Sequence, residues 1–212
     1  AALPSGRRDR ELVAAMYHTH VAGTFALTQA LAELEQPPRL IAAGTLAEYG
    51  GAQAPYSEQT LALPVSPYGS TKLIASELCR LYTMATGAPA AVLRACDLYG
   101  PGRSGGYFLP SLIAALRAGD AFEMSAGEQR RDYLFVDDFV AALQLAATAP
   151  LAGFRIANVG TGEPVALAEL ARLTARLLGK SELLRVGALP YRADEQMLMY
   201  GAVAVAQDWL GW

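Results

Sequence analysis

The sequence predicts an α/β protein organised around a parallel β-sheet. Two short apolar runs, residues 39–45 (RLIAAGT) and 90–98 (AAVLRACDL), have the composition of buried parallel strands. A helix is predicted between them, at about residues 67–85, so the three segments predict a right-handed βαβ unit. A chain of 212 residues that is 53% apolar and 17% charged is large enough for one domain and a small additional lobe.

A long helix and a loop complete the first half of the chain. Apolar residues recur at helical spacing over residues 9–35, with a bend expected near Gly23 and an end at Pro37 and Pro38. Residues 48–67 are rich in Gly, Pro, Ser and Gln, which predicts an exposed active-site loop.

The second half of the chain alternates less regularly between helices and strands. Residues 99–102 (YGPG) end the second strand of the βαβ unit. The predicted helices are residues 108–118, 136–149 and 165–178, the last stopped by Gly179, and the predicted strands are residues 122–124, 132–135 and 154–159. The pattern therefore departs from a simple βα repeat.

Charge and cysteine usage exclude several classes of partner. The formal net charge of -3 gives no electrostatic reason to expect nucleic acid or an anionic membrane. No apolar run reaches the roughly 20 residues that a membrane helix needs, so we expect a soluble protein with no nucleic-acid or membrane partner. Cys79 and Cys96 are too few for a disulfide framework and too far apart for a metal-chelating pair, which favours a reduced, cytoplasmic setting.

Tyr68 and Lys72 are the strongest candidates for catalytic residues. They lie four positions apart in a predicted helix, so their side chains project from the same face. The chain has 15 arginines and only two lysines, and a compact ammonium reaches ribose hydroxyls better than a planar guanidinium does. The ordinary tyrosine pKa is about 10, and both an adjacent ammonium and a cationic nicotinamide favour the phenolate. Tyr68 can then accept and return a proton.

Thr45 strengthens this interpretation because it lies at the C-terminal end of the first predicted strand, where α/β folds bind their ligands. We expect its hydroxyl to hydrogen-bond to a substrate oxygen. Taken singly, Thr45 fits an ordinary strand end, and the pair Tyr68 and Lys72 fits a solvated helix face. The combination of the three residues indicates a catalytic site.

Six stretches of sequence accompany these residues in a fixed order. They are residues 21–24 (VAGT), 44–50 (GTLAEYG), 66–72 (SPYGSTK), 93–102 (LRACDLYGPG), 131–138 (RDYLFVDD) and 158–162 (NVGTG). In this order and spacing the chain resembles the extended short-chain dehydrogenase/reductase family, specifically its nucleotide-sugar epimerases, dehydratases and reductases. The resemblance covers nearly the whole chain and implies a Rossmann-like, doubly wound parallel sheet with a small C-terminal α/β substrate lobe.

The resemblance also implies a domain organisation. Residues 1–106 are expected to be the remaining part of the Rossmann-like cofactor domain, to which residues of about 132–160 return, and residues 107–131 and 161–212 the substrate-binding lobe. The glycine-rich fingerprint of dinucleotide-binding folds is not found, so the first three strands of the family are expected to be missing here. Residues 160–162 (GTG) lack the third glycine and are predicted to form a structural turn.

By the same resemblance, Thr45, Tyr68 and Lys72 take the catalytic roles, with NAD or NADP as the cofactor. The residues expected to bind the cofactor are His20, Gly44, Thr45, Tyr68, Lys72, Ala95 and Leu98. The residues expected to bind the substrate are Asp97, Tyr107, Phe108, Phe122, Met124, Arg131, Arg192 and Glu195. Of these, Arg131 and Arg192 match family arginines that bind the substrate pyrophosphate, a task suited to a guanidinium fork.

Two positions depart from the family pattern: His20 and Asp97 each stand where asparagine is usual. His18 and His20 are two residues apart, which puts their rings on different faces of the helix, and no third ligand is suggested. We therefore expect no metal site.

Dehydratases of the family carry acidic residues just after the catalytic threonine, where this chain has Leu46 and Ala47. Epimerisation through a 4-keto intermediate, or reduction of a 4-keto sugar, is therefore favoured. The alternatives are a dehydratase of the same family and a non-catalytic nucleotide-sugar-binding relative. The resemblance also implies a homodimer formed by the long first helix and the helix that carries Tyr68.

Overall fold

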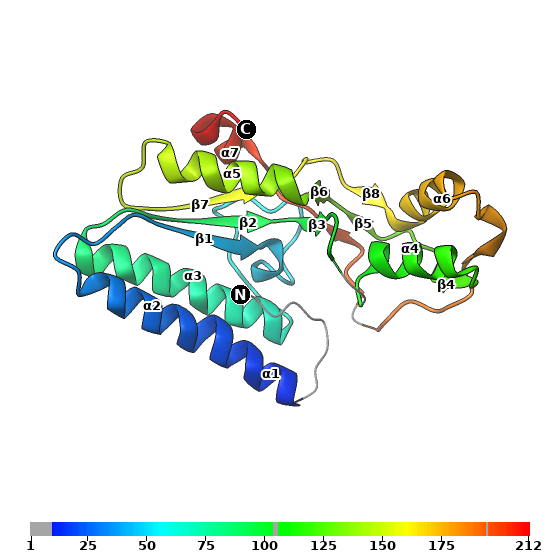
Figure 1. Ribbon diagram of the computed structural model, residues 1–212, viewed down its shortest axis with the longest axis horizontal. Coiled ribbons are helices and arrows are strands. Elements are labelled where there is room, and N and C mark those ends of the chain that lie inside the picture. Colours follow the sequence, from blue (N-terminus) through cyan, green and yellow to red (C-terminus); the bar gives the residue numbers. More distant parts are fainter. Residues whose placement is uncertain (1–9, 104–105, 194) are drawn as a thin grey trace.

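The computed structural model describes residues 10–103, 106–193 and 195–212 and has an α/β fold (Figure 1). Its central sheet is parallel, with strand order β1-β2-β7. The strands are β1 (Leu40–Thr45), β2 (Ala90–Ala95) and β7 (Phe154–Val159). Every residue of β2 is buried, as expected for the middle strand of a sheet covered on both faces. The Rossmann-like class is thereby confirmed.

Helix α3 (Pro67–Thr86) connects β1 to β2, which confirms the βαβ unit. Ser66 caps the start of α3, accepting a hydrogen bond from the Gly69 amide at 3.1 Å, and Pro67 follows at the first helical position. Gly87 ends the helix in the left-handed conformation. Helix α5 (Val136–Thr148) covers the opposite face of the sheet, with the C-terminal helix α7 (Ala204–Leu210) beside it (Figure 1).

The long helix predicted for residues 9–35 exists, although its middle is not α-helical. It consists of α1 (Arg10–Met16), a π-helical segment (Tyr17–Ala22) and α2 (Gly23–Ala32). Residue 9 lies outside the described residues, and the helix ends three residues before the predicted end. The irregularity lies directly before Gly23, where the sequence predicted a bend. The π-helical segment packs against α3. Helices α1 and α2 run along the same side of the molecule (Figure 1).

A second lobe lies beyond the carboxyl ends of the central strands (Figure 1). It contains α4 (Phe108–Ala118), α6 (Leu167–Leu177), the 3-10 helix Ser181–Leu183 and a parallel pair of strands, β4 (Phe122–Met124) and β9 (Leu184–Val186). Its own core includes the fully buried Leu112, Leu116 and Ala171. The predicted bounds of α4 and β4 are confirmed.

The prediction of one strand over residues 90–98 is wrong. The chain leaves the central sheet at Cys96 and continues as β3 (Asp97–Tyr99), which pairs with β6 (Tyr133–Phe135). The helix predicted to begin at residue 165 begins at Leu167 instead. The two residues before it form β8 (Val165–Ala166), in a small sheet with β5 (Arg130–Arg131) and β10 (Leu198–Met199).

The prediction that residues 48–67 form an exposed loop is only partly correct. Glu48, Tyr49 and Tyr56 are fully buried. The two tyrosine rings stack with their centroids 5.0 Å apart, and the Tyr49 hydroxyl donates a hydrogen bond to Asn158 on β7. Their side chains therefore add this segment to the core, whereas Leu61 and Val65 further along are exposed. Among the described residues, no helix is both long enough and apolar enough to cross a membrane.

Candidate active site

The three predicted catalytic residues line one cavity of about 840 Å³ at the carboxyl ends of β1 and β2. Thr45 is the last residue of β1, and Tyr68 and Lys72 come from the first two turns of α3. Gly44, Ala95 and Leu98 line the same cavity. Six of the seven residues expected to bind the cofactor are thus brought together.

His20, the seventh, is not among the residues that line this cavity. It belongs to the π-helical segment, is 4% exposed, and its Nδ1 lies 2.8 Å from the hydroxyl oxygen of Thr71. Its ring meets that of Tyr68 edge to face, with centroids 5.8 Å apart. Burial and the nearby Lys72 ammonium both lower the pKa of His20, which favours a neutral imidazole. His20 therefore packs against the Tyr68 ring without lining the cavity itself.

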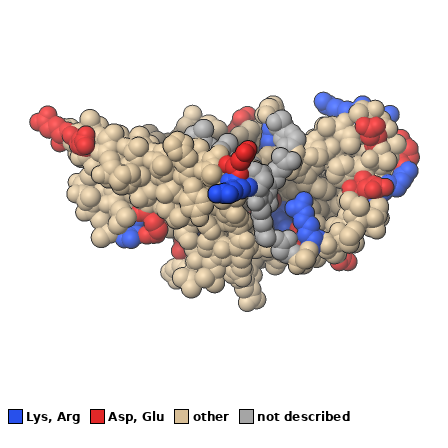
Figure 2. Space-filling model, turned by 90° about the horizontal axis from the view of Figure 1, so that it is seen from below, with Lys and Arg blue, Asp and Glu red and all other residues tan. Residues whose placement is uncertain are grey.

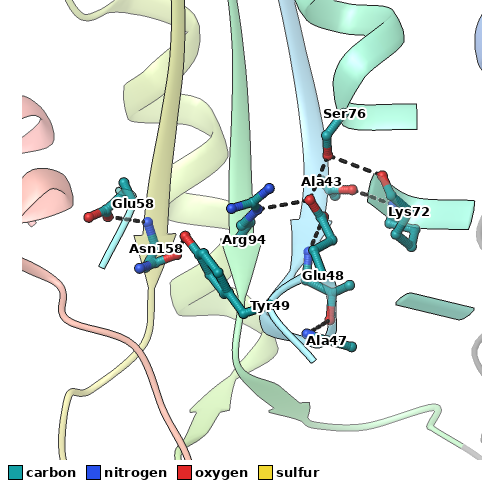
Figure 3. Close-up of polar contacts among 10 residues, drawn as sticks. Ala43, Ala47, Glu48, Tyr49, Glu58, Lys72, Ser76, Arg94 and Asn158 are labelled. Atoms are coloured by element: carbon teal, nitrogen blue, oxygen red, sulfur yellow. Dashed lines mark hydrogen bonds and ion pairs between the residues drawn. The ribbon is translucent and has the colours of Figure 1, made fainter. Parts of the chain in front are cut away.

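Lys72 is directed along the end of β1. Its ammonium donates a hydrogen bond to the backbone carbonyl of Ala43 (Figure 3). Burial lowers the pKa of Lys72 from its usual value, because the ammonium loses hydration, while the negative charge of Glu48 raises it. One of the two lysines of the chain is therefore fixed beside the cavity by a backbone contact.

The electrostatics of Tyr68 differ from the prediction. Burial raises its pKa to about 12, because the phenolate would lose hydration, and a hydrogen bond with Thr45 and the charge of Arg103 oppose this shift. A phenolate here consequently needs a further positive charge at the site.

A second cavity, of about 360 Å³, opens beside the first and lies between β3, β4 and α4. All eight residues expected to bind the substrate line it: Asp97, Tyr107, Phe108, Phe122, Met124, Arg131, Arg192 and Glu195. The rings of Phe108 and Phe122 meet edge to face at 5.9 Å. Asp97, Tyr107 and the two arginines line both cavities, which therefore form one continuous site.

Arg131 is the anchor of the second cavity. Its Nη2 donates to Glu195 Oε1 at 3.0 Å, and both side chains are mostly buried. Burial raises the pKa of Asp97, while Arg131 and Arg103 lower it. The site thus has a cationic wall, with Glu195 orienting one of its arginines.

The predicted structural turn at residues 160–162 is confirmed. The carboxylate of Asp132, which is 1% exposed, accepts hydrogen bonds from the Thr161 amide at 3.1 Å and the Gly162 amide at 2.9 Å. Because these amides are already bonded, the turn cannot cradle a phosphate as a glycine-rich loop would.

Sequence reasoning missed two charged residues next to the site, Glu48 and Arg94. They form an ion pair of 2.8 Å with side chains 0% and 3% exposed. A signal for Glu48 was present, because Thr45 and Glu48 have the Thr-x-x-Glu spacing of a capping box, which the structure contains. Arg94 is the only charge in the otherwise apolar strand β2.

Comparison with known proteins places the chain in one family. The profile of the "NAD dependent epimerase/dehydratase family" matches residues 1–160. The chain is 33% identical over 206 residues to a dTDP-6-deoxy-L-talose 4-dehydrogenase (NAD(P)(+)) of Kitasatospora kifunensis, covering 93% of this chain and 64% of that protein. It is 27% identical over 172 residues to an uncharacterised UDP-glucose epimerase of Bacillus subtilis, covering 79% of this chain and 54% of that protein.

A solved structure supports the same assignment. MoeE5 in complex with UDP-glucuronic acid and NAD has a TM-score of 0.89 and 32% identity, and the match covers 100% of this chain and 71% of that one. The chain spans about half to two thirds of the length of the curated relatives named above. It belongs to the NAD dependent epimerase/dehydratase family, whose members similar to it are nucleotide-sugar epimerases, dehydratases and reductases.

Proposed function

We propose that the protein containing this chain is an NAD(P)-dependent nucleotide-sugar 4-epimerase or 4-keto-sugar reductase. The observation that carries the proposal is the convergence of Thr45, Tyr68 and Lys72 on one cavity that continues into a second, arginine-walled one. The relatives support it, since one is named as a 4-dehydrogenase and another as an epimerase.

The residues of the chain fit the nicotinamide end of such a cofactor. Lys72, Ala95 and Leu98 line the larger cavity at the carboxyl ends of the strands, where α/β sheets bind nucleotides. When bound, NAD(P) supplies hydride transfer and, in its oxidised form, a positive charge that favours the Tyr68 phenolate. The amides of the Thr161 turn are bonded to Asp132, so this turn is not assigned to the cofactor phosphates.

In the oxidative direction, Tyr68 accepts the proton of the sugar hydroxyl as the hydride leaves the carbinol carbon. Thr45, whose hydroxyl neighbours Tyr68, holds the same oxygen by a hydrogen bond. In the reverse direction Tyr68 returns the proton. Oxidation of the alcohol to a ketone removes one proton, which Tyr68 takes, and one hydride, which carries both electrons, so the step balances.

Dehydration would need an acid or base beside the catalytic threonine. Leu46 is 2% exposed and packs in the core, and Ala47 lines the cavity without a titratable group. The carboxylate of Glu48 is bonded to Ser76 and Arg94 instead. These placements favour epimerisation or reduction.

Arg131→Ala is expected to raise the KM for the nucleotide sugar about 10–100-fold with a smaller change in kcat, because a charge-assisted hydrogen bond is worth roughly 1.5–3 kcal/mol. The measurement is steady-state kinetics on the full-length protein. Arg130→Ala is the control, because Arg130 bonds to the Pro164 carbonyl and is not among the cavity residues. Equal KM values for the two variants would refute the role of Arg131.

We also propose that the protein dimerises through α1, α2 and α3. Large apolar side chains on these helices are exposed, among them Phe25 (52%), Leu81 (49%) and Met84 (69%). Figure 2, seen from below, shows that the surface over these helices carries few charged side chains. Such a face is typical of a protein–protein interface.

Leu81→Glu is expected to convert the dimer to a monomer, because it buries a charge in this interface. Leu177→Glu should leave the dimer intact, since Leu177 is 78% exposed on α6 in the other lobe. Sedimentation velocity would distinguish the species. A wild-type protein that sediments only as a monomer contradicts the proposed dimer.

A further inference from the structure

A fully buried carboxylate lies behind the catalytic residues. Glu48 is 0% exposed and ends the short 3-10 helix Leu46–Glu48. Its Oε1 accepts a hydrogen bond from the backbone amide of Thr45 at 2.9 Å. Its Oε2 accepts from the Ser76 hydroxyl at 2.8 Å and from Arg94 Nε at 2.8 Å. Both carboxylate oxygens are therefore bonded.

Arg94 holds this carboxylate from the neighbouring strand. Its guanidinium lies 4.4 Å from the centre of the Tyr49 ring, and the Tyr49 hydroxyl donates to Asn158 on β7. The contacts of Glu48 and Tyr49 therefore join all three central strands, at Thr45 on β1, Arg94 on β2 and Asn158 on β7. Figure 3 shows Glu48, Tyr49, Arg94 and Asn158 side by side. A buried ion pair of this kind gains little net stability over apolar side chains of similar volume, because two charges must be desolvated.

Two of the groups that Glu48 binds lead directly to the catalytic residues. The Thr45 amide belongs to the residue whose hydroxyl bonds to Tyr68. Ser76 lies one turn after Lys72 in α3, and its hydroxyl oxygen is 3.1 Å from the Lys72 carbonyl oxygen. Glu48 thus connects the end of β1 to the turn of α3 that carries Lys72.

A glycine next to Thr45 allows this contact. A Cβ at Gly44 would lie 2.8 Å from Glu48 Oε1 and 2.7 Å from a side-chain carbon of Val92. Both approaches are closer than packed atoms tolerate. Glycine at position 44 is therefore required for the Glu48 carboxylate to lie against the end of β1.

We propose that Glu48, held by Arg94, is a positioning residue that fixes Thr45 and Lys72 relative to each other for proton transfer at Tyr68. The inference rests on the proposed hydride and proton transfer. It adds a residue that touches neither substrate nor cofactor, since Glu48 is absent from the lining of both cavities.

The charge of Glu48 gives the arrangement a measurable signature. It raises the pKa of Lys72 against the opposing effect of burial, and the other titratable groups coupled to Lys72 are Cys79 and His20. Replacing the carboxylate by an amide therefore lowers the pKa of Lys72. This shift reports that Glu48 lies charged beside Lys72, and a fall in kcat with KM retained in a folded variant separates a positioning role from a purely structural one.

The test compares Glu48→Gln with Glu77→Gln in the full-length protein. Glu77 is the matched control, because it also pairs with an arginine, Arg80, at 2.7 Å on α3, but is 47% exposed. For Glu48→Gln we expect kcat to fall roughly 10–100-fold, as for a small misplacement of catalytic groups, with KM for the sugar nearly unchanged. Titration of 13C-labelled lysine by NMR, with Lys72 assigned from Lys72→Arg, should show a lowered Lys72 pKa.

The inference is overturned if folded Glu48→Gln matches Glu77→Gln in both kcat and the Lys72 pKa. If Glu48→Gln does not fold, Ser76→Ala decides, since it removes the link to α3 and leaves the ion pair. Ser76→Ala should lower kcat with KM retained, and wild-type kcat would overturn the inference. The Lys72 titration needs no turnover, so it stands apart from the proposed function, which fails instead if Tyr68→Phe keeps wild-type turnover.

Discussion

Replacing Tyr68 by phenylalanine in the full-length protein is expected to lower kcat roughly 10²–10⁴-fold, the usual range for loss of a general acid or base. The substitution removes one oxygen and preserves the ring that packs edge to face on His20. The fold and the cofactor affinity should therefore be retained. Turnover followed by nicotinamide absorbance, together with calorimetric titration of NAD and NADP, measures both quantities.

Tyr82→Phe is the matched control for this experiment. Tyr82 lies on the same helix and is 3% exposed, but its hydroxyl donates to the Pro38 carbonyl at 2.6 Å, away from both cavities. Its loss should cost about 1 kcal/mol of stability and leave kcat unchanged. If the two variants have the same turnover, Tyr68 is not the proton-transfer residue. If the wild-type protein binds the cofactor without any turnover of a nucleotide sugar, a binding protein without catalysis becomes the better interpretation.

Arg94→Met is expected to lower the free energy of unfolding by roughly 3–5 kcal/mol, because it leaves the Glu48 carboxylate buried without its countercharge. Adding Glu48→Gln to Arg94→Met should restore much of this loss, since the double variant contains no buried charge at this point. Urea unfolding followed by circular dichroism gives the three free energies.

The exposed pair Glu77 and Arg80 provides the comparison for this stability experiment. Arg80→Met should change the free energy of unfolding by at most about 0.5 kcal/mol, because the charges of an exposed pair remain hydrated. An Arg94→Met protein as stable as Arg80→Met would mean that Glu48 is not held in the folded state as a charge buried against Arg94. It would then not be the charged positioning group described above.

The sequence predicted those elements whose structure is decided by local pattern. The bounds of α4 and β7 agree with the prediction because each is a continuous apolar or amphipathic segment closed by a turn residue. The break at Cys96 was missed because residues 90–96 are apolar apart from Arg94 and contain no turn residue. Only pairing of β3 with the distant β6 separates them, and such pairing is a tertiary effect.

For the site, spacing and resemblance identified residues that the structure brings together around Tyr68. They did not identify Glu48, which the composition of residues 48–67 assigned to an exposed loop. Its burial depends on Arg94 and Ser76, which come from two other elements. The raised pKa of Tyr68 was missed for the same reason. The phenol loses its hydration by burial, and that burial depends on neighbours that are remote in sequence.

Only one residue, Cys96, separates β2 from β3, so a short piece of backbone connects the two cavities. Ala95 lines the larger cavity, and Asp97, two residues later, lines both. An extended chain advances about 3.3 Å per residue, so the covalent backbone fixes the separation of these two lining residues. A ligand that occupied both cavities would therefore have to match a spacing that is set by the backbone and not by a movable side chain.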